Sequence, residues 1–224
     1  MPNNLIAYLS QRYYGHKNIE KSPGPYLTLS RETGCNATAL ASEITKILRK
    51  QGLHWHFVNK EILDKSAEKL HLDKNKLEHE FLMSRSNAMD DIVKALSLRY
   101  YKTDKKIRDT IADIIRYEAR QGNVIIVGRA GAITTAGIPG GLHIRLVAPL
   151  EWRIKMLGKR RMFSEKDVKA YIIENDRKRN LLLEQFSGKK GYNNFFDLTI
   201  NTSKFTRQEI IAIILDTMKL KELI

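Results

Sequence analysis

Short apolar runs alternate along this chain with longer segments in which apolar residues recur every three or four positions. Runs of the first kind are typical of buried strands, and the recurrence is typical of amphipathic helices. The pattern predicts five strands, at residues 26–29, 54–58, 124–127, 143–148 and 197–201. It predicts helices at residues 38–49, 60–70, 105–120, 149–161, 164–186 and 206–220, with further helix within 73–102. Strands that alternate with helices in this way indicate a mostly parallel sheet with helices on both faces.

Local signals support several of these boundaries. Residues 124–127 form the unbroken run VIIV, which is typical of a strand covered on both faces. Ser164 and Asp167 have the spacing of an N-terminal helix cap, and Gly52 and Gly122 are expected to end helices. The fold class that follows is α/β with three layers, in which a five-stranded parallel sheet lies between helices.

Ligands of such sheets bind beyond the carboxyl ends of the strands. Here those ends carry the segments 30–36 (SRETGCN), 58–60 (VNK), 128–131 (GRAG) and the loop after Ala148. We therefore expect the functional site at this edge of the sheet.

Composition narrows the class of protein. The 224 residues correspond to one large domain or two small ones, and 42% of them are hydrophobic, which is too many for a disordered chain. No apolar run approaches the roughly 18 residues of a membrane helix, and the first residues lack the apolar core of a signal peptide. The single cysteine excludes an internal disulfide, and the histidines and cysteine lack metal-binding spacing. We expect a cytoplasmic protein with no membrane partner and no metal-ligating residues.

The charge balance points to an anionic partner. Lys and Arg number 39 against 25 Asp and Glu, a net charge of +14. Nucleotide phosphates, nucleic acid or an anionic membrane surface would suit such a chain. A surface that is charged only for solubility explains the balance equally well.

The turn after the first strand is a candidate anion site. A strand, a turn with Gly34 and a helix N-terminus aim backbone N–H groups at one point. A full phosphate-binding loop would read G-x-x-x-x-G-K-[ST], but residues 30–39 contain no lysine and no second glycine. Cys35 also lies near this helix start, where a thiol pKa can fall. An ordinary connecting turn with an unreactive thiol is the alternative.

Arginines supply a second set of candidates. Arg129 directly follows a buried strand and its glycine, and a guanidinium there suits bidentate contact with a phosphate. Asp176 and Arg179 are three apart and share one helix face, while Arg177 points elsewhere. Pairing with nearby carboxylates, or a solvated charged face, would explain the same residues.

Taken in order, six segments resemble the cytidylate kinase-like proteins over nearly all of residues 26–220. They are YLTLSRETG (26–34), VNKEIL (58–63), VIIVGRAG (124–131), RLVAPLEWRIKML (145–157), NDRKRN (175–180) and DLTINTSKF (197–205). The resemblance implies the P-loop fold of the nucleoside monophosphate kinases, with a helical acceptor-binding segment and a lid. It implies transfer of the terminal phosphoryl group of ATP to CMP or a similar nucleoside monophosphate, with magnesium.

The resemblance also implies roles for individual residues. The acceptor nucleotide would be bound by Asn59, Lys60, Arg129, Asp176 and Arg179. The phosphate loop would comprise Gly34, Cys35, Asn36, Ala37 and Thr38. Catalytic roles would fall to Arg31, Arg153 and Arg177, of which Arg177 would face the transferring phosphate.

The loop departs from the family at the positions that matter most for transfer. Ala37 stands where a P-loop has its lysine, and Ala39 stands where it has the hydroxyl that binds magnesium. Phosphoryl transfer depends on positioning and charge stabilisation, so turnover and magnesium binding are both in doubt. Two alternatives to a working kinase stay open: a catalytically impaired pseudokinase, and a nucleic-acid or polyphosphate-binding module on the same fold.

The predicted organisation is an N-terminal extension (1–24) followed by one domain (25–224). Within it, the acceptor-binding insertion is expected at about 60–103 and the lid at about 158–191. Because the lid carries many like charges, we expect it to be open when no anion is bound, with Lys178 in solvent.

Overall fold

The computed structural model describes residues 23–59, 105–158, 164–188 and 191–224. The N-terminal extension up to residue 22 and the whole insertion expected at about 60–103, Lys60 included, lie outside these residues.

The described strands form one five-stranded sheet in which all neighbours are parallel. Their order is β2-β3-β1-β4-β5, so the first strand of the chain lies at the centre. The strands are β1 (Tyr26–Arg31), β2 (His56–Val58), β3 (Val124–Val127), β4 (Gly141–Val147) and β5 (Leu198–Asn201). This arrangement confirms the predicted fold class.

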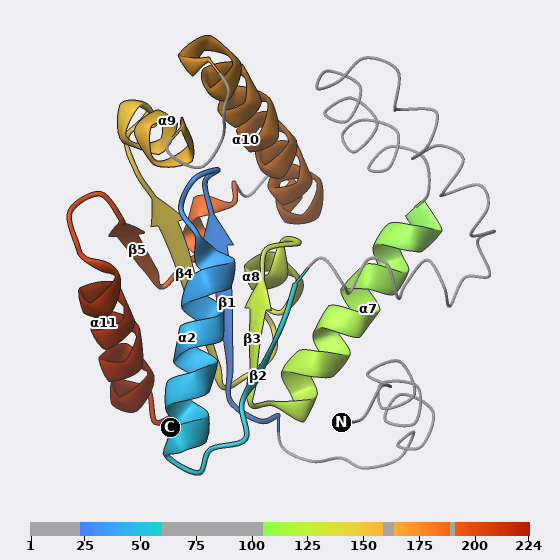
Figure 1. The fold of residues 1–224 in the computed structure, drawn as a ribbon. Helices are drawn as coiled ribbons and strands as arrows, with labels where there is room; N and C mark the ends of the chain where they lie inside the picture. Colours follow the sequence, from blue (N-terminus) through green and yellow to red (C-terminus); the bar gives the residue numbers. More distant parts are fainter. Residues whose placement is uncertain (1–22, 60–104, 159–163, 189–190) are drawn as a thin grey trace, which may run out of the picture.

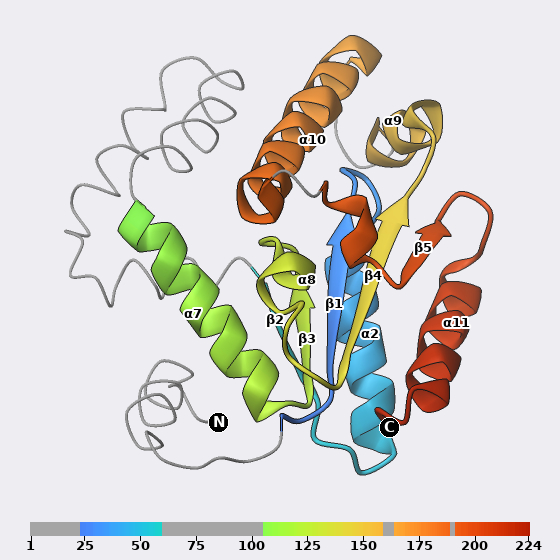
Figure 2. The same cartoon turned by 180° about the vertical axis from the view of Figure 1, so that it is seen from behind.

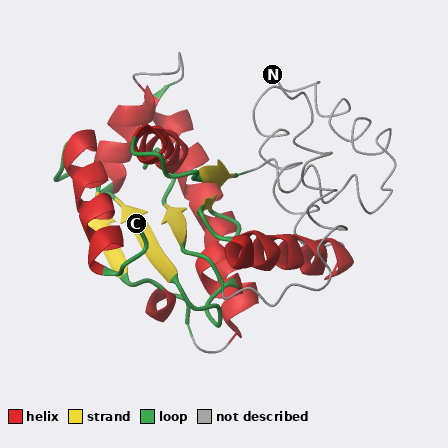
Figure 3. Cartoon of the chain, turned by 90° about the horizontal axis from the view of Figure 1, so that it is seen from below, coloured by secondary structure: helices red, strands yellow, loops and turns green. Residues whose placement is uncertain are grey.

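Helices cover both faces of the sheet and its upper edge. They are α2 (Ala37–Lys50), α7 (Lys105–Gln121), α8 (Gly131–Thr134), α9 (Leu150–Gly158), α10 (Glu165–Ser187) and α11 (Arg207–Leu220), with a 3₁₀ turn η4 (Asn193–Phe195). Figure 1 shows α2 and α11 on one face, and Figure 2 shows α7 and α8 on the other. Viewed from below in Figure 3, the strands lie between the two helical layers. The helices α9 and α10 lie beyond the carboxyl ends of the strands.

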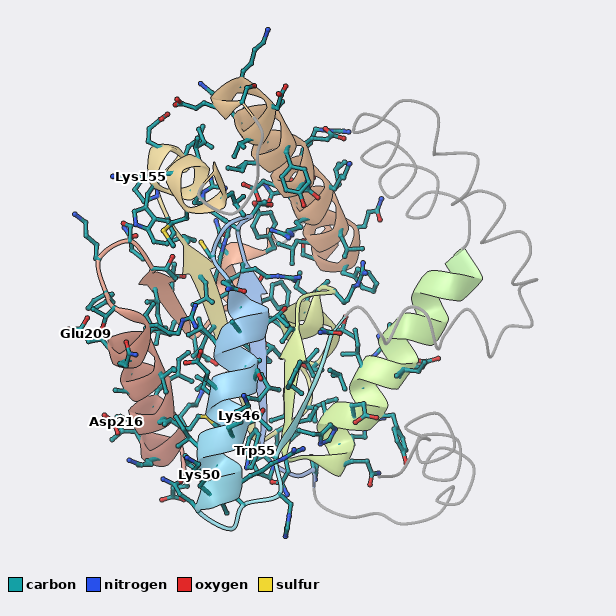
Figure 4. All side chains as sticks on the ribbon, viewed as in Figure 1. Lys46, Lys50, Trp55, Lys155, Glu209 and Asp216 are labelled. Atoms are coloured by element: carbon teal, nitrogen blue, oxygen red, sulfur yellow. The ribbon has the colours of Figure 1, made fainter. Side chains whose placement is uncertain are left out.

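The alternation of side chains along the strands divides the core. In β1, Leu27 and Leu29 face the cluster under α2 and α11, whereas Tyr26 faces α7. In β3 the run VIIV supplies both clusters, which confirms a strand covered on both faces. Trp55 is fully buried on the α2 side and is a core residue. Figure 4 shows the contrasting outward sides of α2 and α11, with Lys46, Lys50, Glu209 and Asp216 in solvent.

Helix ends follow the local signals. Ser164 accepts a hydrogen bond from the Asp167 N–H, as the cap spacing predicted. The last helix has a full capping box between Thr206 and Glu209. The short elements α8 and η4 were not predicted, because four and three residues are too few to show a period. None of the described helices has the length and apolar character needed to cross a membrane.

Candidate functional site

The candidate site is the carboxyl edge of the sheet, where the strand arrowheads in Figure 1 point toward α9 and α10. β1 leads into a turn of residues 32–36, and α2 begins at Ala37. The end of β3 leads into Gly128 and Arg129. These are the segments that the sequence predicted to meet.

The turn after β1 is compact and uses part of its own hydrogen-bonding capacity. The Cys35 N–H donates to the Glu32 carbonyl at 3.2 Å, and the Ala37 N–H donates to the Cys35 carbonyl at 2.6 Å. Gly34 has φ of +104°, a conformation that favours glycine. Some of the amides that would cradle a phosphate in a full P-loop therefore donate inside the turn.

Arg153 of α9 fastens this turn to its neighbours. Its side chain is only 9% exposed, and its Nε donates to the Ala148 carbonyl at 2.9 Å. Its Nη1 donates to the Thr33 carbonyl at 3.2 Å and to the Asp176 carboxylate. The Glu32 carboxylate lies 3.5 Å from its Nε. Arg153 therefore holds the turn, the end of β4 and α10 together, whereas the family resemblance had implied a catalytic role for it.

Asp176 and Arg179 reach the same turn from α10. Oδ1 of Asp176 accepts from the Thr33 N–H at 2.7 Å, and Nη1 of Arg179 donates to the Thr33 hydroxyl at 2.7 Å. The two side chains lie 3.7 Å apart at Nη1 and Oδ1. The prediction that they share a face holds, and that face contacts the loop.

The opposite side of α10 has its own charge cluster. Glu174 accepts two hydrogen bonds from Arg177, at 2.8 and 2.9 Å, and lies 3.4 Å from the Lys178 ammonium. Arg177 lowers the pKa of Glu174 to about 2, with a smaller contribution from Lys178. The expectation that Lys178 stays in solvent is wrong: the residue is 7% exposed, and its ammonium lies beside Glu174. Arg177 is exposed and paired on this side, away from the loop.

The described part of the segment that was expected to form a lid lies against the loop, through Asp176 and Arg179. Opening of this segment without a bound anion stays a prediction. Carboxylates pair with the basic side chains that the structure describes there. The pairs are Arg177 and Lys178 with Glu174, and Arg153 and Arg179 with Asp176.

Arg31 and Arg129 lie at the ends of adjacent strands, since Leu29 of β1 pairs with Val127 of β3. A Cβ placed on Gly128 would stand 1.7 Å from Nη1 of Arg31, so this guanidinium lies directly over the glycine. Arg129 is half-buried and has φ of +57°, a strained conformation for a residue with a side chain. Such conformations persist where the surrounding structure holds them, often at binding sites.

The phosphate-loop residues divide by exposure. Cys35 and Ala37 are buried, each 2% exposed, whereas Asn36 and Thr38 are exposed. The Thr202 hydroxyl donates to the Cys35 sulfur at 3.4 Å, and burial raises the pKa of the thiol. The thiol is therefore packed into the core beneath the loop.

The loop does not fit a magnesium site. Ala37 and Ala39 offer neither charge nor hydroxyl at the expected positions. Among the residues that the structure describes, no group of three or more His, Cys, Asp or Glu could hold a metal ion.

Sequence reasoning did not select Glu32 and Thr33. Glu32 accepts from the Ala148 N–H at 3.0 Å and pairs with Arg153, and Thr33 is the contact point for α9 and α10. Their place between Arg31 and Gly34, directly after a central strand, was the available signal. Asn59 follows β2 at the same edge and is half-buried.

Comparison with known proteins agrees with this geometry. The sequence model of the cytidylate kinase-like family matches residues 26–204, which confirms the family resemblance of the six segments. A solved structure of an uncharacterized protein from Eubacterium ventriosum is similar with a TM-score of 0.62 and 16% identity, over 89% of this chain and 99% of that one. This likeness supports the fold.

Two weaker likenesses support no conclusion about this chain. A shikimate kinase from Bacteroides thetaiotaomicron gives a TM-score of 0.49 at 13% identity, over 89% of this chain and 99% of that one, which is too low to support an argument. A uronate isomerase from Corynebacterium glutamicum is 27% identical over 114 residues, 50% of this chain. The match spans only 22% of that protein's length, so isomerase chemistry does not transfer with it.

Proposed function

Because this chain belongs to the cytidylate kinase-like family, we propose that it binds ATP and a nucleoside monophosphate such as CMP at the carboxyl edge of its sheet, with slow phosphoryl transfer between them. The observation that carries the proposal is the gathering of guanidinium groups at this edge. They belong to Arg31, Arg129, Arg153 and Arg179, against the two carboxylates of Glu32 and Asp176.

The ATP phosphates would be held by the turn and by α10. In the structure the Thr33 N–H donates to Asp176, and the Arg179 guanidinium donates to the Thr33 hydroxyl. Arg31 is the last residue of β1, directly before the turn, and would take part of the role of the missing lysine. Donors of this kind stabilise the charge of a phosphoryl group during its transfer.

The acceptor phosphate would be held by Arg129, across from Arg31. In the transfer an oxygen of the CMP phosphate attacks the terminal phosphorus of ATP, and the bond from that phosphorus to the bridging oxygen breaks, leaving ADP and CDP. No step of this scheme is assigned to a metal, because the loop lacks the residues to hold one.

The residues and hydrogen bonds of the loop explain why transfer should be slow. Ala37 and Ala39 replace the lysine and hydroxyl of a P-loop, and the Cys35 and Ala37 N–H groups donate within the turn. Nucleotide binding without turnover, a pseudokinase, is therefore the second candidate function. A mononucleotide suits a cluster confined to one sheet edge better than a nucleic-acid duplex does.

The test is calorimetric titration of the full chain with ATP and CMP separately, followed by a single-turnover assay with γ-labelled ATP and several acceptors. Binding with slow turnover supports the kinase, and binding without turnover selects the pseudokinase. Failure to bind any nucleotide, together with DNA binding that weakens steeply with salt, would select the nucleic-acid module.

Arg129→Ala gives the sharper test of the acceptor site. Loss of a charged hydrogen bond should weaken CMP binding by about 1.5–3 kcal/mol. The matched control is Arg116→Ala, which removes a half-buried arginine of α7 that pairs with Asp113 three residues away. Equal CMP affinity in the two variants would remove Arg129 from the site.

A further inference from the structure

We propose that Asp176 blocks the phosphate loop in the resting protein, and that a phosphoryl group of the nucleotide binds by displacing it. The proposal rests on the function proposed above and gives Asp176 a role other than contact with the acceptor. It starts from an unusual set of contacts at one residue of the turn.

That residue is Thr33, which is 4% exposed. Its N–H donates to Asp176 at 2.7 Å, its carbonyl accepts from Arg153 at 3.2 Å, and its hydroxyl accepts from Arg179 at 2.7 Å. All three of its polar groups are thus bound by charged side chains of α9 and α10, which lie more than one hundred residues away in sequence. Side chains of α9 and α10 therefore fix the turn at this residue.

The Asp176 carboxylate has the partners that a bound phosphoryl group would have. One oxygen takes a backbone N–H of the turn, and the other takes the Arg153 guanidinium, with Arg179 close by at 3.7 Å. Backbone amides before a helix and arginine forks are the donors that proteins use for phosphates. A phosphoryl oxygen and Asp176 would therefore compete for the same donors.

Both cannot occupy the position, since two anions side by side repel each other. Displacement is feasible because Arg153 keeps Glu32 at 3.5 Å and two backbone carbonyls when Asp176 leaves. Its buried charge stays paired throughout. Asp176 is already 19% exposed in its side chain and can turn to solvent.

This role and the role implied by the family make opposite predictions. If Asp176 contacts the acceptor, Asp176→Asn weakens CMP binding and leaves ATP binding unchanged. If Asp176 blocks the loop, Asp176→Asn tightens ATP binding, because the variant keeps the size of the side chain but loses the competing charge. An unblocked state that is one-tenth populated in the wild type would give a gain of about tenfold.

The experiment titrates wild type, Asp176→Asn and Glu184→Gln with ATP, CMP and pyrophosphate, each separately. Glu184→Gln is the matched control, since it removes one exposed negative charge from the same helix away from the loop. Asp176→Ala is a second variant, which removes the carboxylate and its contacts together.

Tighter ATP binding in Asp176→Asn and Asp176→Ala, but not in Glu184→Gln, supports the block. Unchanged or weaker ATP binding in either folded Asp176 variant overturns it. If no protein binds a nucleotide, the proposed function fails, and pyrophosphate then decides the block: equal affinity for Asp176→Asn and Glu184→Gln overturns it.

Discussion

Gly34 shows at the scale of one residue how tightly the turn is built. Its φ is +104°, and a Cβ added there would lie 3.0 Å from Cβ of Arg153. Gly52 also has a positive φ, of +81°, but a Cβ there would meet nothing within 4 Å. The two positions share the conformational demand and differ in the space available.

We predict that Gly34→Ala destabilises the protein more than Gly52→Ala. The positive φ costs roughly 1–2 kcal/mol in either variant. Only Gly34→Ala adds a contact with the buried Arg153. Urea unfolding of both variants measures the difference, and equal losses would show that Arg153 gives way freely.

The single cysteine yields a second prediction at this scale. Cys35 is 2% exposed, and burial raises its thiol pKa, so little thiolate forms at neutral pH. We expect Cys35 to react with a thiol reagent far more slowly in the native protein than in urea. Because the chain has only one cysteine, the signal needs no assignment. A native rate close to the unfolded one would place the thiol at the surface and contradict the packing against Thr202.

Helix α10 joins the loop to α9 through one of its faces. Asp176 and Arg179 on that face meet the loop, while Glu174 pairs with Arg177 and Lys178 within α10 on the other side. Arg153 provides the link to α9. A helical period in the sequence predicts the helix and its faces, but it does not say which face meets the loop.

The charge cluster on the far face should make α10 sensitive to acid. The folded pKa of Glu174 is about 2, below its ordinary value of 4.5. The stabilisation is therefore complete above pH 4.5 and is lost as the pH falls toward 2. Since the group is partly exposed, we expect Glu174→Gln to cost no more than about 1 kcal/mol at pH 7.

The measurement is urea unfolding of wild type and Glu174→Gln from pH 7 down to pH 2. The difference between them should shrink through the acidic range. Glu184→Gln should follow the wild type at every pH. A difference that stays constant with pH would mean that Glu174 acts through packing rather than charge.

At the scale of the whole molecule, the parallel sheet is a platform that carries several short segments to one edge. The order β2-β3-β1-β4-β5 places the ends of β1 and β3 side by side, although nearly one hundred residues separate them. The helices α9 and α10 then close over that edge.

We predict that ATP with CMP changes hydrogen exchange at residues 31–36, 128–131 and 164–188, and leaves α11 unchanged. These segments hold the loop, the Arg129 turn and α10, whereas α11 packs beside α2 and carries none of the residues assigned to the site. Exchange is measured with and without nucleotides at concentrations that calorimetry shows to saturate. A change spread evenly over the chain would indicate general stabilisation instead of binding at this edge.

Much of this protein was determined by its sequence alone. The pattern of apolar residues predicted five strands close to their observed bounds, since the local order of apolar and polar residues reflects burial on one or both faces of a strand. The cap at Ser164 and the loss of lysine at Ala37 are likewise local facts. The cap marks the start of a helix, and Ala37 shows that the loop lacks the positive charge of a P-loop lysine.

Only the tertiary structure decided which side chains meet. Arg153, Asp176 and Arg179 come to Thr33 from more than one hundred residues away, and nothing in local spacing pairs them. Lys178 is buried on the face of α10 away from the loop, which a helical wheel without neighbours does not show. Ion pairs depend on distances in space, so the sequence identifies the charged residues, and only the fold determines which of them pair.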